Sequence, residues 1–190
     1  FPSTTFFRST FEGYHNKGYF TGGVSDSTNG ITSFQLNRDY LYANKSWFYL
    51  DNEMICLGSN IHGDKNEPVT TTINQARLKG GVYFFDDNKI NELKVGATIS
   101  SKTMQWVYHD KIGYYYLNPA QTTVSAKVQS GNWAEIAAVY KGTEDIYKSV
   151  FTLEIDHDIQ KENSYAYIIL PAVPLNDLKA FRPGFDLIKN

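Results

Sequence analysis

The sequence is poor in cysteine: Cys56 is the only one, which excludes an intrachain disulfide. It lies in the apolar run MICLG, so we expect a buried, inert thiol rather than a nucleophile. Apolar runs of about 18 residues are also lacking, and the first residues have no apolar core of a signal peptide. We therefore predict no membrane-spanning helix. Because the sequence starts without Met, we expect a segment of a longer polypeptide or a processed product.

An excess of positive charge is absent as well. The chain has 18 lysines and arginines against 20 acidic residues, which gives a net charge of -2. Nucleic-acid-binding proteins present a broad basic surface, so we predict no nucleic-acid partner. An acidic ligand would have to be held by a few local Lys or Arg side chains. A hydrophobic content of 42% excludes a disordered chain, and 190 residues suffice for one well-buried core.

Sustained helical periodicity is missing, and short strand patterns take its place. Alternating β-branched and aromatic residues between turn signals predict roughly ten or more strands, which is typical of an all-β fold. The patterns lie in residues 47–50, 53–58, 69–78, 80–87, 89–93, 103–117, 122–136, 149–158 and 164–173. We predict a large antiparallel β-sandwich over residues 1–175, with a mobile loop at 21–30 (TGGVSDSTNG). Residues 176–190 are expected to be a linker toward a further C-terminal domain.

The histidines do not show the spacing of a zinc site, so the residues themselves predict no metal centre. We expect His62 in a solvated loop, His109 in a hairpin turn and His157 at a strand end, the last two with structural roles. Asp156 and Asp158 flank His157, but two acids in a turn are common and make only a weak candidate for a cation site.

The segment FRSTFEGYHNKGYF, residues 7–20, gathers polar and aromatic side chains with little apolar periodicity. A solvated loop would also carry such residues. The segment nevertheless contains what a carbohydrate site needs, namely a carboxylate, hydrogen-bonding groups, aromatic faces and cations for an acidic sugar. These residues are Arg8, Glu12, Tyr14, His15, Asn16, Lys17 and Tyr19.

Four sequence blocks occur in an order that resembles one known family. They are ANKSWFYLDNEMICLGSNI at 43–61, VTTTINQAR at 69–77, WVYHDKIGYYYL at 106–117 and FTLEIDHDIQKENSYAYIILP at 151–171. The blocks are similar to the central β-sandwich of polysaccharide lyase family 8. This family contains hyaluronate lyases, chondroitin AC and ABC lyases, and xanthan lyases.

The resemblance implies a lyase that cleaves uronic-acid-containing glycosaminoglycans by β-elimination, with chondroitin or dermatan sulfate as substrate and hyaluronan as a further option. In the family an upstream α-helical toroid supplies a catalytic Tyr, His and Arg. That domain is absent from this chain, so we expect the segment alone to be inactive. The resemblance further implies a secreted or periplasmic bacterial protein, a monomer without a membrane partner. It leaves a calcium requirement open.

The family's β domain contributes a Glu to the cleft between the domains. FEGYHN resembles the Glu-Gly-x-His stretch of the chondroitin ABC branch, which makes Glu12 the catalytic candidate. Arg8, Tyr14, His15 and Asn16 are the substrate-binding candidates. The hyaluronate and AC branches have a Glu-x-x-Asn spacing that this chain lacks, which favours the ABC-like branch. An alternative alignment places Asp26 in the position of the Glu.

Two other functions are compatible with the residues. The first is a non-catalytic carbohydrate-binding sandwich, with Tyr14 and Tyr19 as a stacking platform. The second is a structural sandwich that supports an adjoining catalytic domain. Saccharide affinity of the isolated chain would indicate the carbohydrate-binding sandwich. An activity that no substitution in residues 8–19 changes would indicate the structural sandwich.

Overall fold

The computed structural model describes residues 15–136, 139, 142, 144–158 and 161–184. In this part of the chain, strands dominate and two short helices accompany them. The strands are β1 (Thr21–Ser25), β2 (Gly30–Arg38), β3 (Leu41–Tyr49), β4 (Met54–Gly63), β5 (Val69–Arg77), β6 (Val82–Asp86), β7 (Lys89–Leu93), β8 (Thr98–Ser101), β9 (Trp106–His109), β10 (Ile112–Tyr116), β11 (Thr122–Gly131), β12 (Ile146–His157) and β13 (Asn163–Leu170). The helices are α1 (Trp133–Ile136) and α2 (Leu175–Ala180).

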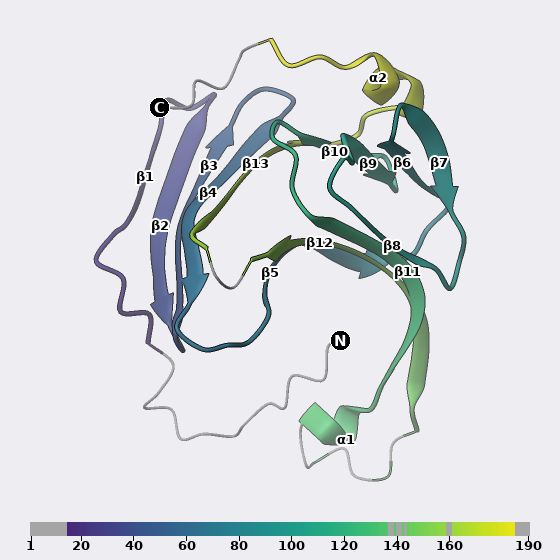
Figure 1. Cartoon of the computed structure of the whole chain (residues 1–190), viewed down its shortest axis with the longest axis horizontal. Helices are drawn as coiled ribbons and strands as arrows, with labels where there is room; N and C mark the ends of the chain where they lie inside the picture. Colours follow the sequence, from purple (N-terminus) through teal and green to yellow (C-terminus); the bar gives the residue numbers. More distant parts are fainter. Residues whose placement is uncertain (1–14, 137–138, 140–141, 143, 159–160, 185–190) are drawn as a thin grey trace.

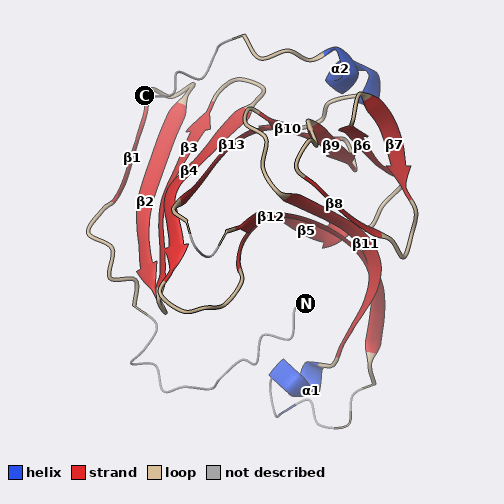
Figure 2. Ribbon diagram, in the orientation of Figure 1, coloured by secondary structure: helices blue, strands red, loops and turns tan. Residues whose placement is uncertain are grey.

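The strands form two antiparallel sheets. The larger sheet has nine strands in the order β1-β2-β3-β4-β13-β10-β9-β6-β7, and the smaller has four in the order β5-β12-β11-β8. Figure 1 shows the large sheet curving around the small one, and Figure 2 shows how little of the chain is helical. The predicted all-β antiparallel sandwich is therefore confirmed.

Tight hairpins set the register of the large sheet. Asp39 and Tyr40 join β2 to β3, and both have positive φ angles, 52° and 68°. Asp87 and Asn88 do the same between β6 and β7, as do Asp110 and Lys111 between β9 and β10. Two consecutive residues with positive φ match the right-handed twist of paired strands, and Asp and Asn tolerate this conformation.

The main core fills the space between the two sheets. Phe151 and Leu153 of β12 are fully buried, and they face Phe84, Val107 and Tyr114 of the large sheet. Cys56 is buried in the same core, and burial raises the pKa of its thiol to about 11. The prediction of a buried cysteine is thus confirmed, and its lack of reactivity stays a prediction.

A second apolar cluster lies on the opposite face of the large sheet. There Leu178 of α2 is fully buried beside Trp106 and Ile168. Residues 176–180 of the segment expected to be a linker therefore belong to a helix that packs on the sandwich. The predicted domain boundary near residue 175 itself stays a prediction.

Three local expectations were wrong. Residues 21–30 do not form a loop: Thr21–Ser25 is strand β1, which pairs with β2 along its whole length. The second strand expected within 122–136 is helix α1, Trp133–Ile136. His62 lies in β4 and stacks on Tyr42 with ring centroids 4.7 Å apart, so it is not a loop residue.

His109 and His157 are buried and hydrogen-bonded, in agreement with the structural roles predicted for them. The Nε2 atom of His109 accepts a hydrogen bond from the backbone N–H of Lys79 at 3.1 Å, and the ring stacks on Phe151. The Nε2 atom of His157 lies 2.8 Å from the hydroxyl of Thr71. Burial lowers the pKa of both imidazoles, and Lys45 lowers that of His157 further.

We expect the sandwich to lose stability as the pH falls below the ordinary histidine pKa of 6.5. The pKa of both rings is lower in the folded than in the unfolded chain, so the unfolded chain takes up protons at a higher pH. The free energy of unfolding therefore falls with the pH until the folded-state pKa is reached. Each ring contributes a slope of up to about 1.4 kcal/mol per pH unit. Urea unfolding at several pH values between about 7.5 and 5 measures this slope of the free energy of unfolding against pH. His157→Gln should flatten the dependence, whereas His15→Gln at an exposed position should leave it unchanged; equal slopes for the wild type and His157→Gln would contradict the assignment.

Candidate functional site

The residues predicted to form the site precede β1 in the sequence. Arg8, Glu12 and Tyr14 lie outside the described residues, and their roles stay predictions. His15 and Asn16 are described. His15 is exposed, and Asn16 is hydrogen-bonded to strand β2.

The side chain of Asn16 fastens the segment that follows Glu12 to β2. Its amide nitrogen donates to the carbonyl of Gln35 at 2.7 Å, and its Oδ1 atom accepts from the backbone N–H of Asn37 at 2.6 Å. The backbone N–H of Lys17 adds a bond to the carbonyl of Asn37 at 2.8 Å. Gly18 passes so close to β2 that a Cβ atom would overlap the carbonyl oxygen of Gln35. Asn16 thus has a structural task, and its predicted contact with substrate stays a prediction.

Neutral hydrogen-bonding side chains line the surface beside this anchor. Gln35 donates from Nε2 to the Oδ1 atom of Asn44 at 3.3 Å, and the hydroxyls of Ser33 and Ser46 form a hydrogen-bonded pair. These residues occupy the face of β2 and β3 opposite to the stacked pair Phe34 and Trp47. Amide and hydroxyl groups of this kind suit the hydroxyls of a sugar.

This polar row was missed from the sequence. The signal was present in β2, because polar residues at 33, 35 and 37 alternate with apolar residues at 34 and 36. It was weaker in β3, where the polar residues at 44 and 46 flank Lys45. Alternation of period two places one set on each face of a strand. The partners across the two strands become visible only with the register, which pairs Gln35 with Asn44 and Ser33 with Ser46.

Asp26, the alternative catalytic candidate, lies in the exposed turn between β1 and β2. Its Oδ1 atom accepts hydrogen bonds from the backbone N–H groups of Asn29 at 2.6 Å and Thr28 at 3.0 Å. These bonds, that to Asn29 foremost, lower the pKa of the carboxyl. The carboxylate therefore stabilises the turn in which Asp26 lies. A catalytic role for Asp26 stays an untested alternative.

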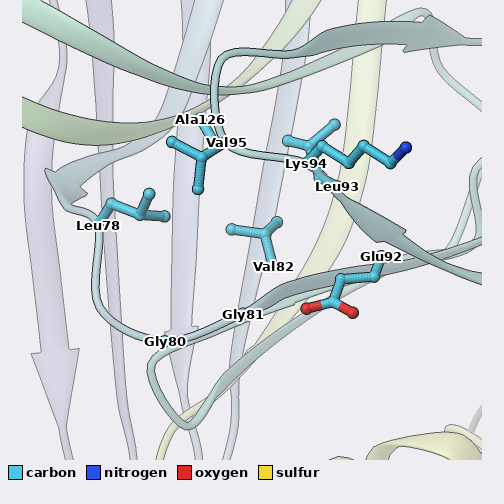
Figure 3. Close-up of a pocket in the computed structure, with 9 residues that line it drawn as sticks. All are labelled: Leu78, Gly80, Gly81, Val82, Glu92, Leu93, Lys94, Val95 and Ala126. Carbon is cyan, nitrogen blue, oxygen red and sulfur yellow. The ribbon is translucent and has the colours of Figure 1, made fainter.

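A cavity of about 440 Å³ lies between the β5–β6 connection, β7 and β11. Figure 3 shows its apolar wall, which includes Leu78, Val82 and Val95. Glu92 and Lys94, drawn to the right of this wall, give it one charge of each sign. An apolar cavity with balanced charge does not select an acidic sugar.

Metal ligands are not grouped in the described part of the chain: no three His, Cys, Asp or Glu side chains come together there. Asp156 accepts a hydrogen bond from the hydroxyl of Thr123 at 2.6 Å, and Asp158 lies 3.3 Å from the ammonium of Lys161. A calcium requirement stays a prediction. None of the described helices is long and apolar enough to cross a membrane.

Comparison with known proteins finds one family. A family model described as polysaccharide lyase family 8, super-sandwich domain, matches residues 4–182. The chain is 38% identical to the chondroitinase-AC of Pedobacter heparinus over 155 residues, which are 81% of this chain and 22% of that protein. It is 27% identical to a hyaluronate lyase of Enterococcus faecalis, covering 91% of this chain and 19% of the relative. It is also 27% identical to the chondroitin sulfate ABC exolyase of Bacteroides thetaiotaomicron, covering 95% of this chain and 18% of the relative.

Solved structures agree with these relatives. A chondroitinase AC lyase, determined in complexes with oligosaccharides, superposes with a TM-score of 0.77 at 35% identity, covering 84% of this chain and 24% of that one. A xanthan lyase from Paenibacillus superposes with a TM-score of 0.74 at 22% identity, covering 84% of this chain and 17% of that one, and supports the fold. The chain spans about a fifth of the length of the curated relatives that it matches.

Proposed function

Because this chain belongs to polysaccharide lyase family 8, we propose that it is the sandwich domain of a lyase acting on a glycosaminoglycan. The observation that carries the proposal is the family match over residues 4–182, together with 38% identity to a chondroitinase. In the proposed reaction a base removes the proton from C5 of the uronic acid. The electron pair forms the C4–C5 double bond, the bond from C4 to the leaving oxygen breaks, and this oxygen takes up a proton.

Such a reaction needs the uronate carboxylate to be neutralised and a group positioned to transfer the proton. We propose that an upstream helical domain of the same polypeptide supplies these groups and that Glu12 orients them at the shared cleft. The anchored Asn16 supports this placement.

For the substrate we propose chondroitin sulfate. Relatives named for chondroitin include both an AC and an ABC enzyme, at 38% and 27% identity respectively. The Glu-Gly-x-His segment favours the ABC-like branch, whereas the higher identity favours the AC enzyme. Dermatan sulfate separates the two, because an ABC-like enzyme is expected to cleave it as well as chondroitin sulfate.

The experiment compares this chain with a longer polypeptide that also carries the upstream domain. Both are incubated with chondroitin sulfate, and the absorbance of the unsaturated product is followed. We expect turnover by the longer polypeptide and none by the chain alone. Robust turnover by the chain alone would overturn the shared site, and no turnover of any uronic-acid polymer by the longer polypeptide would overturn the proposed function.

We propose that the protein is secreted or periplasmic, because a polysaccharide substrate is met outside the cytoplasm. We also propose a monomer, which size-exclusion chromatography with light scattering measures. Assay after removal of divalent cations tests the calcium requirement.

A further inference from the structure

A second cavity, of about 250 Å³, lies where α2 meets the outer face of the large sheet. This face is turned away from the small sheet, as Figure 1 shows. The cavity lies among β6, β9 and β10 in the sheet order, at the end opposite to β2, to which Asn16 is anchored.

The floor of the cavity is a row of aromatic side chains. Phe85 pairs with Trp106 across β6 and β9, and Trp106 pairs with Tyr115 across β9 and β10. Cross-strand partners lie on the same face, so the three rings form one row roughly 10 Å long. The rings of Phe85 and Trp106 are stacked, with centroids 5.9 Å apart and an interplanar angle of 17°. Phe85 and Tyr115 remain partly exposed, whereas Trp106 between them in the row is buried.

Two cationic side chains line the cavity together with this row. Lys179 lies in the last turn of α2, and Arg182 lies two residues after the helix ends. The helix is firmly seated, because Leu178 is fully buried and Gly113 beneath it leaves no room for a side chain: a Cβ atom would lie 2.8 Å from Leu178. The Nη1 atom of Arg182 donates to the carbonyl of Phe181 at 2.6 Å, which holds the guanidinium at the end of the helix.

Among the described residues, the charge of these cations is not balanced locally. None of these residues places a carboxylate in the lining of the cavity, and neither Lys179 nor Arg182 forms an ion pair with them. The 440 Å³ cavity differs, because it carries Glu92 as well as Lys94. In a chain with a net charge of -2, two unpaired cations over an apolar floor make a local anion-selective site.

Two amide side chains complete the lining. Asn88 lies in the turn between β6 and β7, and Gln105 directly precedes β9. Both are exposed, and neither side chain is hydrogen-bonded to another described residue. A primary amide both donates and accepts hydrogen bonds, which matches the hydroxyl and acetamido groups of a sugar.

We propose that this cavity binds an anionic pyranose unit of a polysaccharide. The apolar face of the sugar ring lies on Phe85 and Tyr115, and its carboxylate or sulfate is held by Lys179 and Arg182. Binding needs no turnover, so the proposal can be tested independently of the proposed lyase activity.

The test is isothermal titration of the 190-residue chain with a chondroitin sulfate hexasaccharide, with amide chemical-shift mapping to locate the site. We expect shifts at Gln105 and Tyr115, and at least about tenfold weaker binding for the double variant Lys179→Ala/Arg182→Ala. Asn88→Gly removes an amide at a φ of 63°, where glycine is well tolerated, and should also weaken binding.

A matched control separates this site from general charge attraction. Lys127→Ala/Lys148→Ala removes two exposed cations from the small sheet and should leave the affinity unchanged. A hyaluronan hexasaccharide, which has only carboxylates, tests whether sulfate is needed; binding of either anionic hexasaccharide supports the site. Unchanged affinity in the Lys179/Arg182 variant, equal loss in the Lys127/Lys148 variant, or equal binding of a neutral N-acetylglucosamine hexamer would overturn the proposal. Binding of inorganic sulfate without any binding of the hexasaccharides would overturn it as well.

Discussion

Glu12→Gln should lower kcat about a hundredfold to a thousandfold on chondroitin sulfate, in a polypeptide that carries the upstream helical domain. The substitution keeps the shape of the side chain and removes its negative charge. A carboxylate that orients a proton-transferring group in a closed cleft loses this effect when it becomes a neutral amide. The rate of formation of the unsaturated product measures kcat, and the thermal midpoint checks that the fold is intact.

Asp26→Asn is the matched control for this variant. The amide oxygen can still accept the bonds from Asn29 and Thr28, so the turn between β1 and β2 should persist. We expect wild-type turnover. Loss of turnover in Asp26→Asn together with normal turnover in Glu12→Gln would move the catalytic role to Asp26.

Phe151→Ala should lower the free energy of unfolding by about 3–5 kcal/mol, which is a large share of the stability of a typical domain. Phe151 is fully buried in the middle of β12, and its ring lies 4.3 Å from that of His109 and 6.3 Å from that of Tyr114. Its cross-strand neighbours, Ala126 and Ala76, are too small to fill the cavity left behind. Urea denaturation of the chain measures the loss.

Tyr147→Ala is the control for the core substitution, since it removes an aromatic ring from the same strand. Tyr147 is 63% exposed, so we expect a change within about 0.5 kcal/mol. A loss below about 1 kcal/mol for Phe151→Ala would mean that the interface between the two sheets is not the main source of stability.

The strands with strong alternation were predictable from the sequence because their pattern reports burial on one face. β5, β6, β7, β9 and β10 lie within the predicted stretches, and β12 and β13 overlap two others. The hairpin bend expected around His109 lies at residues 110–111. β1 was missed because its side chains are mostly exposed on both faces, so no alternation marks it. Its pairing with β2 supplies the backbone hydrogen bonds that its composition does not predict.

The candidate site was predictable to a smaller extent. The cluster in residues 7–20 stood out by composition, but the link between Asn16 and β2 joins residues about twenty positions apart. The second cavity is further removed from any local signal. Its lining comes from β6, β9, β10 and α2, and Lys179 and Arg182 lay in the stretch expected to be a linker.

The sequence has no basic excess, no disulfide framework and no sustained helical periodicity. By itself it determined the all-β class, the family resemblance and the segment around Glu12 as the candidate site. Each of these depends on residue types and on short-range spacing. Only the tertiary structure decided which face each strand presents and that His62 of β4 stacks on Tyr42. The same holds for the cavity that Lys179 of α2 and Arg182 just after it line together with the row of Phe85, Trp106 and Tyr115. These features depend on strand register and on packing between distant segments, which no single stretch of sequence contains.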